Sequence, residues 1–146
     1  MNIDLLNTCN LIWICMLLHL IADFCLQGCL ANLKQKEWVE NQVKKLYKTY
    51  EGKEKSFEWQ VFLRKKYKND YIAGLICHAF MWSVVTFFPL MFITDSILFS
   101  ILVVANIVIH TIVDHMKANM HRINLCEDQL IHLAEVIATV LIARGV

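Results

Sequence analysis

The chain has 146 residues, of which 58% are hydrophobic, and its formal net charge is only +1. This length leaves room for one domain, and the mean hydropathy of +0.48 lies well above that of a soluble globular domain. With one Pro and four Gly in the whole chain, we expect an all-α membrane protein. The N-terminal apolar stretch has no basic region before it and carries Asp4 there, so we expect a retained membrane helix rather than a secretory signal peptide.

The first predicted membrane helix covers about residues 5–33, which are apolar around His19, Asp23 and Gln27. Residues 34–70 follow as a charged segment with 11 of the 14 Lys and Arg but 6 of the 13 Asp and Glu. Its apolar positions 39, 43, 46 and 50 have helical spacing, which fits either an interfacial amphipathic helix or a solvated basic loop with scattered aromatic residues. The positive-inside rule places this segment in the cytoplasm and both chain termini outside.

Three further helices are predicted at about residues 70–93, 95–120 and 125–143. Pro89 is expected to kink or end the first of these, and Asp95 is expected to cap the second. The last is marginal as a membrane span because its uncharged stretch is short and follows Glu135. We therefore predict a polytopic four-helix transmembrane bundle in the inner (cytoplasmic) membrane, with an interfacial basic loop between its first two helices.

Three of these helices each carry a His and an Asp four residues apart, and the remaining one carries a single His. The residues are His19 and Asp23, His110 and Asp114, Asp128 and His132, and the lone His78. Four residues make about one helical turn, so each pair lies on one helix face. A carboxylate at the centre of a membrane helix costs about 2.5–3.5 kcal/mol on insertion scales, so each needs a compensating partner.

The order within the pairs predicts that they converge. The His precedes the Asp in the two helices that run toward the cytoplasm, and the Asp precedes the His in the helix that runs away from it. All three pairs therefore place the Asp nearer the cytoplasm and the His about 6 Å deeper. Glu135 continues the stripe of the last pair, while Gln27 and Asn106 extend the stripes of the other two and are predicted to support them by hydrogen bonds.

Imidazoles and carboxylates in this pattern predict a site for a divalent metal, with zinc preferred and iron, manganese or nickel as alternatives. The predicted ligands are His19, Asp23, His78, His110, Asp114, Asp128 and His132. Four acids including Glu135 carry a charge that two divalent ions would cancel, so one or two ions are expected. The rival interpretation is a metal-free His–Asp network that joins helices or relays protons, and a carboxylate-bridged di-iron bundle is less favoured because the chain has a single H-x-x-E pair.

Three other groups of residues have a simpler interpretation. His115 and His121 lie on other faces of their helix and are expected to be solvated. The six Cys include no C-x-x-C pair and are expected to act as small apolar side chains rather than as ligands or disulfides. Lys117 either meets an anionic substrate group at the interface or anchors the helix end by snorkelling.

Four motifs give the chain a family resemblance: HLIADFCLQ at 19–27, LICHAF at 75–80, HTIVDHMK at 110–117 and DQLIHL at 128–133. In their order they resemble the domain of unknown function 3307 family of small bacterial and phage membrane proteins. The resemblance covers nearly the whole chain apart from the charged segment, and it implies that Gln129 belongs to the same site. It implies no activity.

The favoured function is a metal-dependent hydrolase that acts on a lipid headgroup or another phosphoester at the cytoplasmic membrane face, with Glu135 as general base and Lys117 near the substrate. The alternative is a non-catalytic phage or mobile-element membrane protein that perturbs the membrane, moves ions, or binds a host protein through residues 34–70. A nucleic-acid partner is not expected, because the segment has no known basic binding motif. The oligomeric state is left open.

Overall fold

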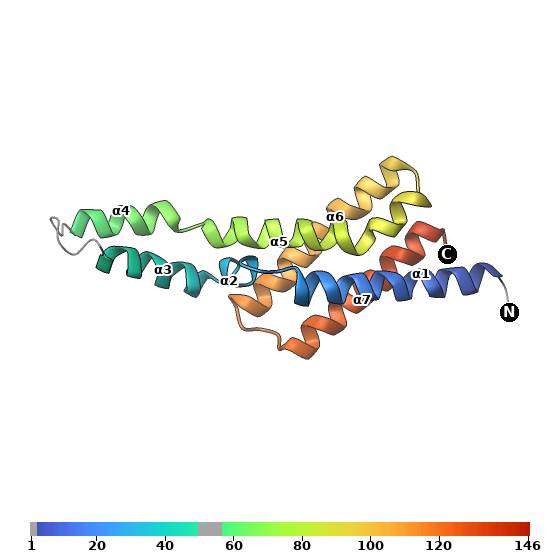
Figure 1. Cartoon of the computed structure of the whole chain (residues 1–146), viewed down its shortest axis with the longest axis horizontal. Coiled ribbons are helices and arrows are strands. Elements are labelled where there is room, and N and C mark those ends of the chain that lie inside the picture. Colours follow the sequence, from blue (N-terminus) through green and yellow to red (C-terminus); the bar gives the residue numbers. More distant parts are fainter. Residues whose placement is uncertain (1–2, 50–56) are drawn as a thin grey trace.

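The structure, a computed structural model, describes residues 3–49 and 57–146, and these ranges are almost entirely helical (Figure 1). The elements in order are α1 (Ile3–Leu20), the π-helical turn η1 (Ile21–Cys25), α2 (Leu30–Leu33), α3 (Lys36–Thr49), α4 (Phe57–Tyr67), α5 (Asp70–Phe87), the 3₁₀ turn η2 (Phe88–Phe92), α6 (Ser96–Ala118) and α7 (Leu125–Arg144).

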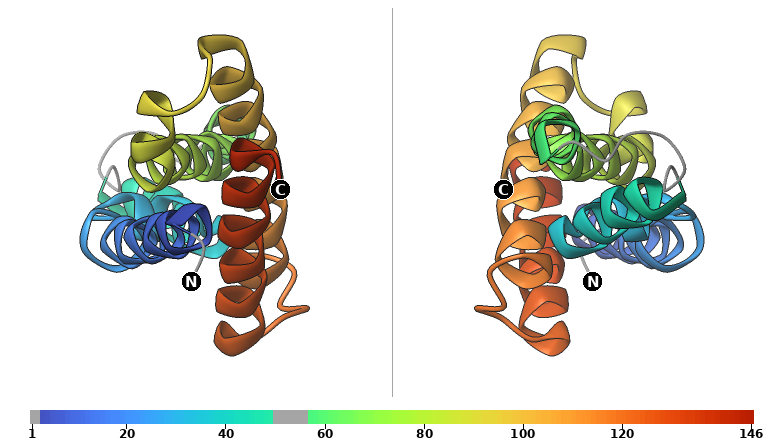
Figure 2. Two further views of the ribbon diagram at one scale, coloured as in Figure 1. Left: turned by 90° about the vertical axis from the view of Figure 1, so that its right-hand side faces the viewer. Right: turned by 90° about the vertical axis from the view of Figure 1, so that its left-hand side faces the viewer.

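Four long helices meet in the middle of the molecule. Helices α1 and α5 run side by side in opposite directions, and the α6–α7 hairpin packs across both of them. Figure 2 shows this crossing clearly, because α1 and α5 are seen nearly end-on while α6 and α7 stand upright. Side chains from α1, α5, α6 and α7 therefore share one interior at the crossing.

The predicted helix over residues 5–33 is not continuous. α1 gives way to the π-helical turn η1, and Gly28 then adopts a φ of +49°, a left-handed conformation that glycine tolerates best. The chain resumes as the short helix α2, which packs closely on α5: a Cβ on Gly74 would lie 2.8 Å from the carbonyl carbon of Leu33. The break tilts the end of the predicted span and returns the chain to the bundle.

The charged segment contains two helices, α3 and α4, which form a hairpin that continues beyond the bundle in line with α1 and α5 (Figure 1). The helix predicted here is confirmed for α3, and its apolar residues Val39 and Val43 are buried, as is Leu63 of α4. Its position at the membrane interface stays a prediction. The predicted stripe fails at Leu46, which is 43% exposed, and its last position, residue 50, lies outside the described residues. The alternative of a solvated loop is wrong for residues 36–49 and 57–67.

Two helix ends predicted from the sequence, at Asp95 and before Pro89, are confirmed. Asp95 caps α6 by accepting hydrogen bonds from the backbone N–H groups of Ile97 and Leu98 at 3.0 and 2.9 Å. α5 ends at Phe87, just before Pro89, and a 3₁₀ turn follows. α7 begins with a capping box that the sequence analysis did not identify, formed by Asn124 and Glu127.

The described part of the chain has an apolar outside and a polar inside. Three stretches are long and apolar enough to cross a membrane: Leu6–Cys25, Glu58–Phe92 and Ser96–Ala118. The outer face of α6 shows the pattern best, with five exposed apolar side chains at helical spacing: Ile97, Ile101, Val104, Val108 and Ile112. α7 is not among the three stretches, in keeping with its expected marginal character. Such a surface suits lipid rather than water.

Candidate metal centre

The helix crossing encloses a cluster of titratable side chains, each at most 8% exposed. Its members are His19, Asp23, His78, His110, Asp114, Asp128, His132 and Glu135. They come from α1, η1, α5, α6 and α7. The His and Asp residues of separate helices therefore meet in one interior, as predicted, while the two layers expected for them stay a prediction.

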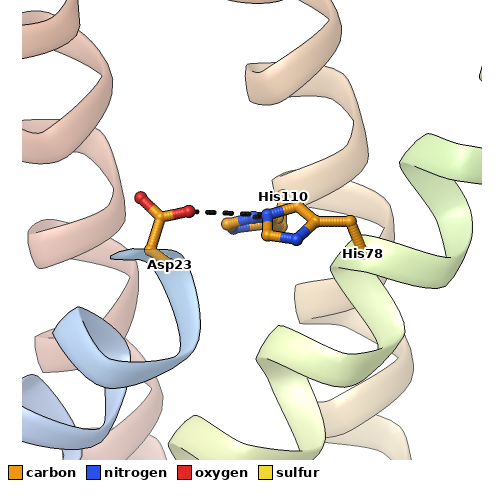
Figure 3. Close-up of side chains that lie close together, drawn as sticks. All are labelled: Asp23, His78 and His110. Carbon is orange, nitrogen blue, oxygen red and sulfur yellow. Dashed lines mark hydrogen bonds and ion pairs between the residues drawn. The ribbon is translucent and has the colours of Figure 1, made fainter. Parts of the chain in front are cut away.

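One group of donor atoms surrounds the imidazole of His78. Its Nε2 lies 3.4 Å from Oδ1 of Asp23 and 3.3 Å from Oδ2 of Asp114. The Nε2 atom of His110 lies 3.2 Å from that of His78 and 3.7 Å from the same Asp114 oxygen. Figure 3 shows Asp23, His78 and His110 pointing toward one another from three separate elements.

A second group surrounds His132 on α7. Its Nε2 lies 3.5 Å from Oδ1 of Asp128 and 3.9 Å from Oδ1 of Asp114. The two oxygens of Asp114 thus face different imidazoles, Oδ2 toward His78 and His110 and Oδ1 toward His132. Asp114 is the residue that links the two groups.

Glu135 contacts the opposite edge of the same imidazole, where its Oε2 lies 3.2 Å from Nδ1 of His132. A carboxylate that accepts the Nδ1 hydrogen fixes the tautomer and leaves Nε2 free to bind a metal, as in carboxylate–histidine–metal arrangements. This contact favours an orienting role for Glu135, whereas the role expected from the sequence was that of general base. Glu135 also groups with His110 and His132 closely enough to donate a ligand atom itself.

His19 stands apart because both of its ring nitrogens already have partners. The indole N–H of Trp82 donates to Nδ1 at 2.8 Å, and an indole N–H can only donate. A neutral His19 therefore carries its hydrogen on Nε2, which lies 3.2 Å from Oε1 of Gln129. The amide of Gln129 in turn donates to Asp23 at 2.8 Å and to Asp128 at 3.1 Å. In this geometry His19 positions the carboxylates through Gln129 rather than facing the metal-ligand groups.

Two lysines flank the carboxylates. Lys34, which the sequence analysis assigned to the basic segment, is buried and donates to Oδ2 of Asp114 at 2.8 Å. Lys117 donates to Oδ2 of Asp128. This contact places Lys117 at the site, whereas its two predicted roles were substrate contact and helix anchoring.

The sequence offers no valid signal for Lys34. Its 11-residue spacing from Asp23 would share a face only in a continuous helix, and the helix breaks between the two residues. Trp82 was also missed, yet it follows His78 by one turn on α5. Its indole stacks on His110, with ring centroids 4.0 Å apart.

The supporting amides differ in what they touch. Gln27 donates to Oδ1 of Asp23 as expected. Asn106 instead bonds Thr139 at 3.0 Å and the Leu102 carbonyl at 2.7 Å, so it joins α6 to α7 one turn away from the cluster.

The two remaining histidines of α6 and the following turn also differ from each other. His115 is half-buried and stacks on Tyr71, with ring centroids 6.0 Å apart, so its expected solvation is only partial. His121 is exposed as expected.

The donor chemistry fits a divalent transition metal. With zinc bonds of 2.0–2.1 Å, the edge of a ligand tetrahedron is about 3.3 Å, close to the 3.2–3.4 Å separations around His78. Three of the eight buried side-chain atoms without a hydrogen-bond partner in the described residues lie on one stripe of α7: Asp128 Oδ1, His132 Nε2 and Glu135 Oε1. All three are acceptors when His132 carries its hydrogen on Nδ1, and unpartnered buried acceptors are costly unless a donor or a cation binds them.

The lysines change the expected number of ions. Four buried acids and two lysines leave a charge of −2 when the imidazoles are neutral. One divalent ion balances this charge, whereas the acids alone indicated two. No cysteine enters any of the three metal-competent groups found in the described part of the chain, so the donor set is His and carboxylate. That set is typical of catalytic zinc sites rather than structural ones.

Comparisons of the chain with protein-family models, with curated proteins and with solved structures give no match. The resemblance to the domain of unknown function 3307 family therefore stays a prediction that depends on its four motifs.

Proposed function

We propose that the chain is an integral membrane metalloprotein that holds one divalent ion, zinc by preference, where α1, α5, α6 and α7 cross. The observation that carries this proposal is the packing of Asp23, His78, His110 and Asp114 donor atoms at spacings that suit a single ion. The apolar outer faces of α1, α5 and α6 support membrane embedding.

In this proposal His78, His110, Asp23 and Asp114 bind the ion, while Asp128 and His132 form a neighbouring group with Asp114. Glu135 holds the His132 ring through Nδ1, while Lys34 and Lys117 keep Asp114 and Asp128 ionised and oriented. By the positive-inside rule, the lysine side of the cluster and the α3–α4 hairpin face the cytoplasm.

The reaction that suits this donor set best is hydrolysis of a phosphoester, such as a lipid headgroup. A bound divalent ion supplies Lewis acidity and activates water near neutral pH. Lys117 is 28% exposed at its side chain, so it is the charged group of the site that a phosphate entering from the interface would meet first. A buried interior that excludes bulk water strengthens each of these electrostatic contacts.

A non-catalytic role is the alternative, and the projecting α3–α4 hairpin favours it because it offers a basic surface to another molecule. The two functions differ in what the buried cluster is for. If the chain acts only through the hairpin, the cluster is a His–Asp network that joins the helices, and its variants keep the protein's cellular phenotype.

The experiment is elemental analysis of the full chain purified in detergent without chelator. We expect about one zinc, iron or manganese ion per chain, lost in His110→Ala and retained in the exposed control His121→Asn. Helix content by circular dichroism shows that the variants are folded. The metal site is refuted if folded wild-type protein holds less than about a tenth of an ion per chain and binds none after dialysis against the metal salts.

Hydrolysis is tested separately on the metal-loaded protein with a phosphodiester reporter in lipid micelles. We expect turnover per bound metal ion that falls by at least about tenfold in Lys117→Met. Absence of turnover with full metal content refutes the hydrolase and keeps the metal site.

A further inference from the structure

The base of the α3–α4 hairpin holds a cavity of about 510 Å³ that is separate from the metal cluster. Five cationic residues line it: Lys36, Lys44, Arg64, Lys65 and Lys68. Glu40 is the single acidic residue in its lining. The site therefore has a net charge of +4 between two helices, which suits an anion and disfavours a cation.

The floor of this cavity is apolar. Val39 and Val43 line it, and both are buried at 7% and 8% exposure against the small core that joins α3 to α4. Tyr67, the last residue of α4, also lines it. A ligand that fits has a negatively charged head and an apolar part, which together describe a phospholipid better than a free phosphate.

The depth of the cavity agrees with this ligand. The apolar stretch that contains α5 ends at Phe92, and about 20 residues span the hydrocarbon core of a bilayer. Twenty residues counted back from Phe92 reach the first turn of α5, at about residue 73, so Tyr67 and Lys68, which precede α5, would lie at the level of the lipid headgroups. Lys36 lies at the same end of the hairpin, because its backbone N–H is held by Asn119 at the end of α6.

Within the residues that the structure describes, two of the five lining cations, Lys36 and Lys44, have only weak partners. Lys36 pairs with Glu40 only at 4.0 Å, and both side chains are more than half exposed. The Nζ of Lys44 reaches the neutral amide oxygen of Asn41 at 3.4 Å. Exposed contacts of this kind contribute little, so the lysines can turn to an incoming anion at small cost.

We propose that the α3–α4 cavity binds the headgroup of one anionic phospholipid from the cytoplasmic leaflet, with Arg64, Lys65 and Lys44 on the phosphate and Val39 and Val43 against the glycerol region. The inference rests on the membrane embedding proposed above but not on the metal ion. Its effect is to hold the base of the hairpin, which is next to α2 and Lys34, at the membrane surface.

Native mass spectrometry of the detergent-purified full chain tests the proposal, with phosphatidylglycerol and phosphatidylcholine of identical acyl chains titrated in parallel. We expect one tightly held phosphatidylglycerol per chain and at least tenfold weaker phosphatidylcholine. Arg64→Gln with Lys65→Gln should weaken the binding of phosphatidylglycerol about 30-fold, because each removed charge contributes roughly fivefold. The matched control pair, Lys45→Gln with Lys66→Gln, lies on the same two helices outside the cavity and should change binding less than threefold.

Equal weakening by both pairs of substitutions would mean that surface charge alone attracts the lipid, and the site would be refuted. Equal affinity for the two lipids refutes it as well. If inorganic phosphate displaces the lipid and binds with the same affinity as the lipid, the cavity is a site for free anions instead. Metal content is measured on the same samples. If the lipid site is wrong but the metal centre is right, the metal content stays at the wild-type value, so the two failures can be told apart.

Discussion

Replacing Lys34 by Met removes the cation from a buried ion pair that joins α2 to α6 across 80 residues of sequence. The side chains of Lys34 and Asp114 are 8% and 2% exposed, and their charged atoms are 2.8 Å apart. Removing one partner of such a pair costs about 3–5 kcal/mol, because the other charge remains buried. Asp114 keeps His78 at 3.3 Å, so we expect a loss near the lower end, about 3 kcal/mol.

The assay is reversible unfolding of the purified chain in mixed detergent micelles, followed by fluorescence of its four Trp residues. A chelator is present throughout, because a bound cation would compensate for the missing lysine. The control is Lys36→Met, two residues away, whose partner Glu40 lies at 4.0 Å with both side chains more than half exposed. Such a surface pair is worth less than about 1 kcal/mol after solvent screening.

A second variant separates the ion pair from simple packing of the lysine stem. In Lys34→Met with Asp114→Asn no charge is stranded, so the double variant should lose at least about 1 kcal/mol less than the sum of the two single variants. The buried pair would be refuted if the stability losses of Lys34→Met and Asp114→Asn were additive in the double variant. It would also be refuted if Lys34→Met and Lys36→Met lost the same stability.

Three other substitutions test different parts of the structure. Trp82→Phe removes the donor to His19 Nδ1 and should cost about 1–3 kcal/mol in the same unfolding assay; a change below about 0.5 kcal/mol would contradict the hydrogen bond. Gly74→Ala places a Cβ 2.8 Å from Leu33 and should cost about 1–3 kcal/mol, whereas an unchanged midpoint would show that α2 does not pack there. Asp95→Ala removes the N-cap of α6 and should cost about 1 kcal/mol, with Asp95→Asn close to wild type; equal losses in the two variants would argue against capping.

Local rules were enough for much of the helix pattern. Asp95 and Pro89 mark helix ends because one supplies oxygens to free N–H groups and the other cannot continue the hydrogen-bond ladder. The break after Leu20 was not predictable in this way, since apolar periodicity continues through residues 21–33. A π-helical turn and one left-handed glycine are stabilised there by packing on α5, which periodicity does not report.

The sequence by itself determined that His and Asp side chains from separate spans meet, because spacing fixes a helix face and chain direction fixes the order along it. Only the tertiary structure decided which of these side chains face the proposed metal ion and which ones position the others. Trp82 and Gln129 occupy both nitrogens of His19, while Lys34 returns over the break to reach Asp114. These partners come from different helices, and which atoms touch depends on how α6 and α7 cross α1 and α5, a geometry that no local pattern contains.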